Sequence, residues 1–579
     1  MSKSILSLIE KVEEAIPLYH ITFFVFVGFM VYFRVLFNNF VWDDMDQVLN
    51  NPLIQHLSNI PYFFTASTFS TGGAVLSLAG AYYRPLMTVV FSFNHALWGL
   101  NPFGFHLFDV ILHIANTIFV FLLLKRLFSF HKFKFSQTAA FIASSLYLVH
   151  PVNVESVAYI SATSELLYTF FALVAIYTAL TFCLRKEISI IHLSVIFLSI
   201  LASLFSKESG IISVLLVLIV SFIYFRDKFR ILFLVCLSSL GVYSIFRFAI
   251  AKLSANQQLW PMPIAHATLA ERLLTLPYEL FSYLRLIFFP KDLHISQADL
   301  VTNVSDHRFY LLLAIILIFA VASGIFMIRM KEKLSIFFLL WFLISLGLVL
   351  NIVPLYYTVE ERWVYFPLIG FLGIISIFII KVLSQSNFFQ KIFMLGVISI
   401  FFVLFSLRTM ARTADWQDAL TLFGRDIKLS ATSAELHNNY GVALYKSGDR
   451  LRAKEEFATA LNLAPDNFSM LNNLGSIYAE EGNYDEAKNL YIKSIKISPT
   501  ATAYENLAQI YLLTQKPNDT LEFLKEAIVA FPNSPNLNKF IALSLFAVNA
   551  TEEAKMYAQK SVMLNSSTEN INLLQQILK

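Results

Sequence analysis

Three carboxylates lie in a short stretch directly after the first long apolar segment of the chain. Asp43, Asp44 and Asp46 closely follow an apolar run over residues 17–37. Because a charge in the hydrocarbon of a membrane costs on the order of 3 kcal/mol, we expect these side chains just outside it. One interpretation is that Asp43 or Asp44 caps a short interfacial helix. The other is that one of them, with a slight preference for Asp43, is a catalytic base that takes a proton from a hydroxyl.

Cations occur in the segments that connect other apolar runs, and they could hold a phosphate. Arg84, Lys207 and Arg362 are residue types that pair strongly with phosphate oxygens, although an arginine at the end of a span also reaches toward lipid headgroups. Five further polar residues are candidates for supporting roles: His106, His150, Glu155, Glu208 and Glu361. A buried histidine is commonly only a packed core residue. The hypothesis of a site therefore depends on convergence, because all of these groups are expected on the same side of a membrane.

The composition is that of a polytopic membrane protein. Hydrophobic residues make up 57% of the 579 residues and charged residues only 14%, against about 25% charged residues in soluble domains. No basic, aromatic-rich soluble surface suggests nucleic-acid binding, and Cys183 and Cys236 fall in apolar runs, where core thiols are expected. The sequence contains no glycine-rich phosphate loop, HExxH or GxSxG motif, and no metal-ligand cluster with convincing spacing. A transferase on the outer face would then draw its donor from the membrane, and a polyprenyl-phosphate sugar meets that need.

About eleven apolar runs are candidates for membrane-spanning helices. They lie near residues 17–37, 104–124, 136–149, 162–184, 189–205, 209–225, 231–250, 309–328, 334–352, 363–381 and 391–408. Short basic connectors alternate with the others, and the positive-inside rule places the basic set in the cytoplasm. The N-terminus is then expected inside. The acidic stretch, the candidate cations and everything after residue 408 are expected outside.

The last part of the chain has a polar helical pattern with a period of about 34 residues. Small, aromatic and proline positions recur in phase in the first two copies: Gly441, Ala453, Phe457, Ala460, Pro465, then Gly475, Ala487, Tyr491 and Pro499. This pattern is typical of tetratricopeptide repeats, in which small residues let paired helices approach closely. The predicted fold is all-α, with a transmembrane bundle over residues 1–410, a connecting helix within 411–433, and about four repeats plus a capping helix over 434–579. The repeats are expected to bind an extended polypeptide, with a purely structural role as the alternative.

Several short stretches of the membrane part share a combination of residues with one group of enzymes. They are Val41-Trp42-Asp43-Asp44 with Asn50-Asn51-Pro52, Tyr83-Arg84-Pro85-Leu86, Phe105-His106 with His113, His150-Pro151-Val152 with Glu155, Ser206-Lys207-Glu208-Ser209-Gly210, and Glu361-Arg362 with Tyr365. Together with the repeats they resemble the transmembrane and tetratricopeptide-repeat family of O-mannosyltransferases, which have the GT-C architecture. The resemblance implies a GT-C-like bundle with Asp43-Asp44 as its catalytic carboxylate motif. It also implies a dolichyl- or undecaprenyl-phosphate mannose donor, and transfer of the sugar, with inversion, to a Ser or Thr hydroxyl of an exported protein.

One position departs from the pattern of that family. Relatives often carry Gly-Arg before the acidic residue at the head of the fourth span, whereas this chain has Thr163 in place of the arginine, ahead of Glu165. This leaves its specificity toward donor or acceptor open. The chain ends in Ile577-Leu578-Lys579 without a KDEL-type retrieval signal. That ending favours a bacterial inner membrane, with the repeats in the periplasm, over the endoplasmic reticulum with lumenal repeats.

Two other functions fit the same sequence. A non-catalytic scaffold would use the spans only to anchor a peptide-binding array. A lipid-linked sugar transporter would need polar groups that run through the spans to the inner side, whereas the candidate groups concentrate at the outer ends. The sequence leaves open the sugar, the acceptor and whether a divalent metal takes part.

Overall fold

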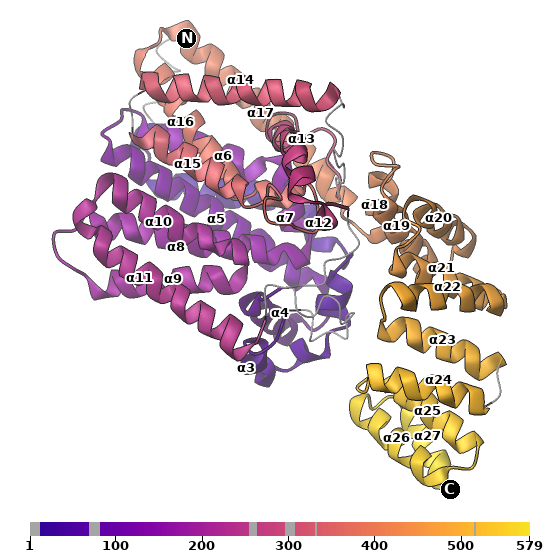
Figure 1. Cartoon of the computed structure of the whole chain (residues 1–579). Coiled ribbons are helices and arrows are strands. Elements are labelled where there is room, and N and C mark those ends of the chain that lie inside the picture. The colour runs from indigo at the N-terminus through magenta and orange to yellow at the C-terminus, as the bar shows by residue number, and fades with distance from the viewer. Residues whose placement is uncertain (1–11, 69–81, 254–262, 296–306, 331–332, 515–516) are drawn as a thin grey trace. The chain divides into compact units, whose positions relative to one another are not determined.

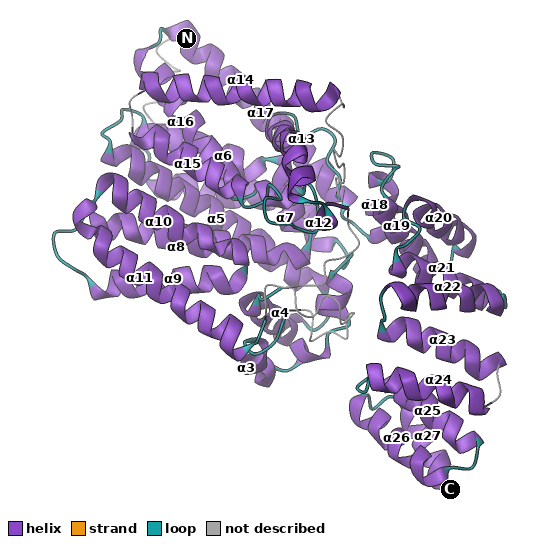
Figure 2. Ribbon diagram, viewed as in Figure 1, coloured by secondary structure: helices purple, strands orange, loops and turns teal. Residues whose placement is uncertain are grey.

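The chain folds into helices. The computed structural model describes residues 12–68, 82–253, 263–295, 307–330, 333–514 and 517–579, and the regular secondary structure in these ranges is helical (Figure 2). The chain forms two compact units, and along the sequence the boundary between them falls between Leu429 and Ser430. The predicted all-α fold is confirmed.

Helices occupy all eleven segments that were predicted as spans. They are α2 (Pro17–Tyr32), α5 (Pro102–Phe130), α6 (Ser136–Val149), α8 (Thr163–Cys183), α9 (Ile190–Ser206), α10 (Ile211–Tyr224), α11 (Arg226–Ser244), α14 (His307–Met330), α15 (Lys333–Gly347), α16 (Pro367–Gln385) and α17 (Phe388–Asp415). Among the described residues, six helical stretches are long and apolar enough to cross a membrane: those that contain α2, α5, α8, α11, α16 and α17. Helices α8 to α11 lie side by side in the first unit (Figure 1). The first unit is therefore a bundle of apolar helices, as predicted.

Helix α13 (Leu269–Phe288) lies in one of the long connectors and fixes the loop that leads to Arg362. The hydroxyl of Thr268 accepts the backbone N–H of Glu271, and the Glu271 carboxylate accepts the N–H and hydroxyl of Thr268, which starts the helix with a capping box. Further along the helix, the buried Glu279 accepts a hydrogen bond of 2.8 Å from the Asn351 amide. The same amide donates to the carbonyls of Tyr357 and Thr358. The backbone before Arg362 is thereby held in place.

The end of α17 and the short helix α18 (Ala419–Asp426) form a corner around one buried arginine. Two guanidinium nitrogens of Arg412 donate to the two carboxylate oxygens of Asp426, at 2.9 and 3.3 Å. The second Asp426 oxygen also accepts the N–H of Ile295 at 3.0 Å. Arg412 further lies 3.6 Å from the buried carboxylate of Glu361, next to Arg362. One fully buried cation thus joins three segments that are distant in sequence.

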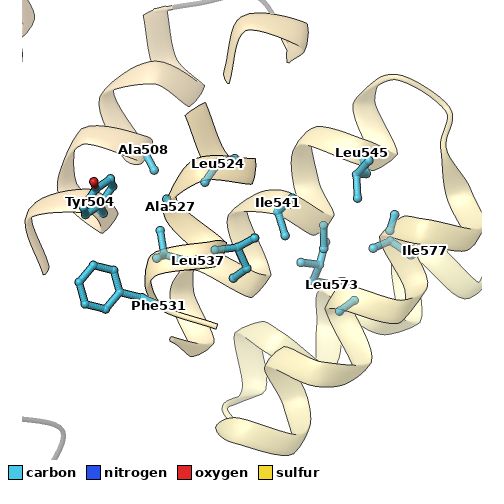
Figure 3. Close-up of a cluster of buried hydrophobic side chains, with 14 residues drawn as sticks. Tyr504, Ala508, Leu524, Ala527, Phe531, Leu537, Ile541, Leu545, Leu573 and Ile577 are labelled. Atoms are coloured by element: carbon cyan, nitrogen blue, oxygen red, sulfur yellow. The ribbon is translucent and has the colours of Figure 1, made fainter. Parts of the chain in front are cut away.

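The second unit is a stack of antiparallel helix pairs. The pairs are α19 (Ala434–Ser447) with α20 (Arg450–Leu463), α21 (Phe468–Glu480) with α22 (Tyr484–Ile497), α23 (Ala501–Thr514) with α24 (Pro517–Ala530), and α25 (Pro535–Ala547) with α26 (Thr551–Leu564), followed by α27 (Thr568–Leu578). Figure 3 shows the core of the last two pairs and α27, where apolar side chains from all of these helices meet. Leu573 and Ile577 of α27 belong to this core. The helix α27 therefore covers the open end of the stack, as a capping helix does.

Close contact within each pair depends on glycines at the signature positions. A Cβ added at Gly441 would lie 2.7 Å from the Phe457 ring, and one at Gly475 would lie 2.8 Å from the Tyr491 ring. We expect Gly441→Leu to separate α19 from α20 and to lower the unfolding midpoint of the second unit, because overpacking costs about 1–3 kcal/mol or more. Circular dichroism melting of the full chain would measure the change. Gly448→Ala is the comparison, because a Cβ there would lie in open space and only the φ of +91° would be strained. We expect it to lower the unfolding midpoint less than Gly441→Leu does. An equal or larger decrease for Gly448→Ala would contradict the packing argument.

Candidate functional site

The acidic stretch after α2 is held in place by one of its own aspartates. Asp44 is fully buried, and its oxygens accept the N–H of Ser161 at 2.7 Å, the Ser161 hydroxyl at 2.6 Å and the N–H of Val41 at 3.1 Å. Burial raises the pKa of Asp44 to about 7, although these hydrogen bonds oppose the shift. Asp44 is the N-cap residue of the π-helical turn η2 (Met45–Leu49), but its side chain does not cap that turn. Asp44 therefore ties the loop to the segment at Ser161.

Asp43 has a different environment from its neighbour. Its side chain is only partly buried, and it lies beside the Tyr159 hydroxyl and within electrostatic reach of Arg362 and Arg84. Burial raises the pKa of the Asp43 carboxyl. The Tyr159 hydroxyl and the two arginines lower it, and the charge of Asp46 raises it. Of the two aspartates, only Asp43 keeps part of its surface exposed.

A block of aromatic rings and one arginine stands next to Asp43. The rings of Trp42 and Tyr159 stack with centroids 5.3 Å apart and an interplanar angle of 16°. The Arg362 guanidinium lies 5.7 Å from each of these ring centroids and 5.9 Å from that of Tyr357, within the range of cation–π attraction. Trp42 has φ of +53°, in the left-handed region that bulky residues rarely adopt. The stack thus holds Trp42, and with it the start of the acidic stretch, in an unusual backbone conformation.

Arg362 is also paired with two carboxylates. It forms an ion pair with Glu155, whose second oxygen accepts the Arg362 N–H at 3.0 Å, and its guanidinium lies 2.9 Å from the Glu360 carboxylate. Both glutamates are fully buried. The two carboxylates hold the Arg362 side chain in one orientation. Together they carry one more formal negative charge than the arginine carries positive charge.

Arg84 and Lys207 reach the same region from other loops. Arg84 directly precedes α4 (Pro85–Trp98). Its Nε lies 3.2 Å from a carboxylate oxygen of Glu208. Lys207, between α9 and the 3-10 turn η7 (Glu208–Gly210), pairs with the buried Glu165 at the head of α8. Burial lowers the pKa of Lys207, and the positive charges of Arg84 and Arg362 lower it further, against the effect of Glu165. These interactions place the three predicted cations in one electrostatic cluster with Asp43.

The remaining predicted residues lie in packed, buried surroundings. His106 is fully buried in α5. His150 is buried as well, with one ring nitrogen 3.0 Å from the Ile287 carbonyl and the other accepting the N–H of Val152 at 3.3 Å. Glu361 faces Arg412, as described above. These three residues therefore stabilise the fold around the site, whereas Glu155 and Glu208 contact the cations directly.

Comparisons with known proteins agree with both parts of the chain. Residues 434–467 and 466–533 match models of the tetratricopeptide repeat. Over 451 residues, the chain is 27% identical to protein O-mannosyl-transferase F38B6.6 of Caenorhabditis elegans, a match that covers 75% of this chain and 61% of the relative. Over 521 residues, it is 27% identical to human protein O-mannosyl-transferase TMTC3, with 84% of this chain and 56% of the relative covered. The chain is a relative of the protein O-mannosyl-transferases.

The resemblance found in the sequence is thereby confirmed. The chain spans little more than half the length of these curated relatives. Among solved structures, the pilF protein of Pseudomonas aeruginosa matches with 20% identity and a TM-score of 0.24, over 27% of this chain and 78% of that chain.

In this relative of the O-mannosyl-transferases, Thr163 has a partner of its own. The Thr163 hydroxyl lies 2.8 and 3.0 Å from the two oxygens of the buried Asp109. Asp109 in turn lies within electrostatic reach of Asp44. A neutral hydroxyl thus stands at the position of the departure noted in the sequence, and it pairs with a carboxylate without adding a positive charge there.

Sequence reasoning missed several residues that the structure of this O-mannosyl-transferase relative brings to the site. Tyr159 was not singled out, although it closely follows the predicted candidates His150 and Glu155. Arg247 was missed as well: it is a lone cation in an apolar run at the outer end of a predicted span, and that position was the available signal. Within the ranges that the structure describes, no group of three or more metal-ligating side chains is assembled.

Proposed function

We propose that this chain transfers a hexose, mannose by analogy with its relatives, from a polyprenyl phosphate to a Ser or Thr hydroxyl of a protein. The observation that carries the proposal is the position of Asp43. It is a partly exposed carboxylate next to an aromatic stack, within reach of cations that come from distant loops. A carboxylate beside a cation cluster suits the attack of a hydroxyl on a sugar that is linked to phosphate.

The reaction requires one base and one stabilised leaving group. The acceptor hydroxyl oxygen attacks the anomeric carbon and forms the new glycosidic bond, while Asp43 takes the hydroxyl proton. The bond between the anomeric carbon and the phosphate oxygen breaks, and the phosphate leaves with the electron pair. A single displacement of this kind inverts the configuration at the anomeric carbon. Arg84, Lys207 and Arg362 stabilise the charge that develops on the phosphate.

The repeats supply the acceptor polypeptide in this proposal. Side-chain amides join neighbouring repeats: Asn473 donates to Asn438 at 2.8 Å, and Asn506 donates to Asn472 at 3.1 Å. Each asparagine amide has two N–H donors and one acceptor oxygen. The N–H and C=O groups that these asparagine pairs do not use can therefore form hydrogen bonds with the backbone of an extended peptide. Binding there raises the local concentration of acceptor hydroxyls. We place this site and the repeats on the non-cytoplasmic face, in a bacterial inner membrane facing the periplasm.

Transfer by purified protein tests the proposal. The full chain in lipid nanodiscs is incubated with polyprenyl-phosphate mannose and a Ser/Thr-rich peptide, and the product is analysed by mass spectrometry and by NMR of the anomeric proton. We expect a glycopeptide with the configuration opposite to that of the donor. Absence of transfer with any lipid-linked hexose, together with peptide binding that survives replacement of the whole membrane bundle by a single unrelated span, would favour the scaffold instead.

The pH dependence of transfer should report the environment of Asp43. The carboxylate must be ionised to accept a proton, and burial raises its pKa above the ordinary value of 3.8. We therefore expect kcat/KM to fall about tenfold per pH unit on the acid side, beginning above pH 3.8. Asp46 raises the pKa of Asp43 by its negative charge, so Asp46→Asn should move this acid limb to lower pH. If the acid-side decrease of kcat/KM in Asp46→Asn occurred at the same or a higher pH than in the wild type, Asp43 would not be the base.

A further inference from the structure

The charges around the candidate site raise a difficulty for phosphate binding. Three cations were predicted to hold the phosphate, but each has a carboxylate partner of its own. Lys207 pairs with Glu165, Arg84 with Glu208, and Arg362 with both Glu155 and Glu360. These three cations have four carboxylate partners, so on their own they offer a bound anion no net positive charge, and stabilising a leaving phosphate requires a further cation.

A fourth cation, Arg247, makes the part of this cluster around Glu208 positive. Arg247 lies in the π-helical turn η8 (Ile245–Ile250) that continues α11, and its Nη1 is 3.2 Å from the second oxygen of Glu208. The same nitrogen donates to the Tyr243 hydroxyl at 2.8 Å. Glu208 is therefore shared by Arg84 and Arg247, one on each oxygen. Two guanidinium groups face one carboxylate, which leaves one surplus positive charge.

The geometry fixes this pair of arginines and leaves it reachable. Glu208 also accepts the backbone N–H of Tyr83 at 2.9 Å, and the Arg84 N–H donates to the Thr68 hydroxyl at 3.0 Å. The arginine side chains are 15% and 12% exposed, and Glu208 keeps 32% of its side chain exposed. The cluster is thus held by several segments of the chain, while all three side chains keep part of their surface exposed. π-Helical turns of this kind occur frequently at functional sites.

We propose that Arg84 and Arg247, held around Glu208, form the binding site for the phosphate of a polyprenyl-linked substrate. The inference deepens the proposed function, on which it rests for the identity of the lipid. A sugar phosphodiester carries one negative charge, which matches the one surplus positive charge. When the sugar leaves, the phosphate becomes a monoester with a second ionisable oxygen. The same two guanidinium groups then meet a larger charge, so they favour the products of bond cleavage over the intact donor.

Lipid binding without sugar transfer tests this site. The full chain is placed in phosphatidylcholine nanodiscs, and binding of undecaprenyl phosphate is compared with binding of undecaprenol. We expect the wild type to prefer the phosphate, and Arg247→Ala to weaken phosphate binding by about tenfold or more while undecaprenol binding stays the same. Arg230→Ala, an exposed cation near the other end of α11, is the matched control and should leave both unchanged. Equal phosphate binding by Arg247→Ala and the wild type would overturn the proposal.

A second variant tests the charge argument with the opposite sign. Glu208→Gln keeps an acceptor for the Tyr83 N–H but removes the negative charge, so phosphate binding should become tighter. Weaker binding in Glu208→Gln would overturn the surplus-charge explanation. Competition with phosphatidylglycerol and with inorganic phosphate distinguishes the ligand sources: the proposal expects neither to displace undecaprenyl phosphate at equal amount, and displacement by either would overturn it. If Arg247-dependent binding is found but no sugar is transferred, the proposed function fails and the phosphate site stands.

Discussion

Asp43→Asn is expected to lower the rate of sugar transfer by about 10²–10⁴-fold, the usual contribution of a general base. Asparagine has nearly the same shape as aspartate but cannot accept the proton of the acceptor hydroxyl. Asp43 is partly exposed, and the hydrogen bond that its carboxylate accepts from the Tyr159 hydroxyl can also be accepted by an amide oxygen. The thermal unfolding midpoint of the variant should therefore stay close to that of the wild type. Single-turnover transfer with a saturating lipid donor would measure the loss.

Asp44→Asn is the control for this experiment. Its side chain accepts three hydrogen bonds in a fully buried position, and an amide has only one oxygen to serve them. We expect its main effect on stability, with loss of activity in proportion to loss of folded protein. If Asp44→Asn instead abolished transfer in a stable protein while Asp43→Asn remained active, the roles of the two aspartates would be exchanged. Full activity of the double Asn variant would exclude both as the base.

Arg412→Met is expected to produce the largest loss of stability in the membrane unit. Removing one partner of a buried ion pair typically costs about 3–5 kcal/mol, because the other charge is left without compensation. Arg412 is fully buried, and its loss would leave Asp426 with only the longer contact of 3.6 Å to Arg425 and would remove the cation paired with Glu361. Since Glu361 precedes Arg362, the loop that carries the candidate site should loosen as well.

Thermal denaturation of the detergent-solubilised protein, followed by loss of monodisperse protein, would measure this effect. Arg408→Met is the matched control. Arg408 lies one turn earlier in α17, is partly exposed and donates to the Lys291 carbonyl, so the loss of stability from its replacement should be small. A similar shift for both variants would show that any cation on this turn serves equally well. The double variant Arg412→Met with Asp426→Leu should recover part of the stability, since it leaves no unpaired charge in that pair.

The sequence was most informative where structure depends on local patterns. Apolar runs and their alternating connectors identified the helical segments of the membrane bundle, because a span is recognised from its own residues. The repeats were recognisable for a similar reason, since small residues such as Gly441 and Gly475 recur in phase with the rings that they accommodate. Both features can be recognised from one stretch of chain at a time.

The candidate site was less accessible from sequence because its contacts join distant residues. Glu155 and Arg362 are 207 positions apart, and Tyr83 and Glu208 are 125 apart. No local pattern indicates that Arg362 has two buried carboxylate partners or that Arg247 shares Glu208 with Arg84. Local spacing also failed to separate the two adjacent aspartates. Only the segment at Ser161, brought in from another loop, makes one of them buried and leaves the other accessible.

The left-handed backbone at Trp42 has a consequence for how the neighbouring carboxylate is positioned. A bulky residue in this conformation is strained by roughly 1–3 kcal/mol and keeps it only while its surroundings compensate. The compensation here comes from a ring that stacks on Tyr159. A substrate that displaced Trp42 from this contact would release the strain, and the backbone would relax to a conformation in which Asp43 points elsewhere. The proposed base is therefore aligned only while this stack is intact, and we expect a sugar that displaces the tryptophan to be transferred more slowly.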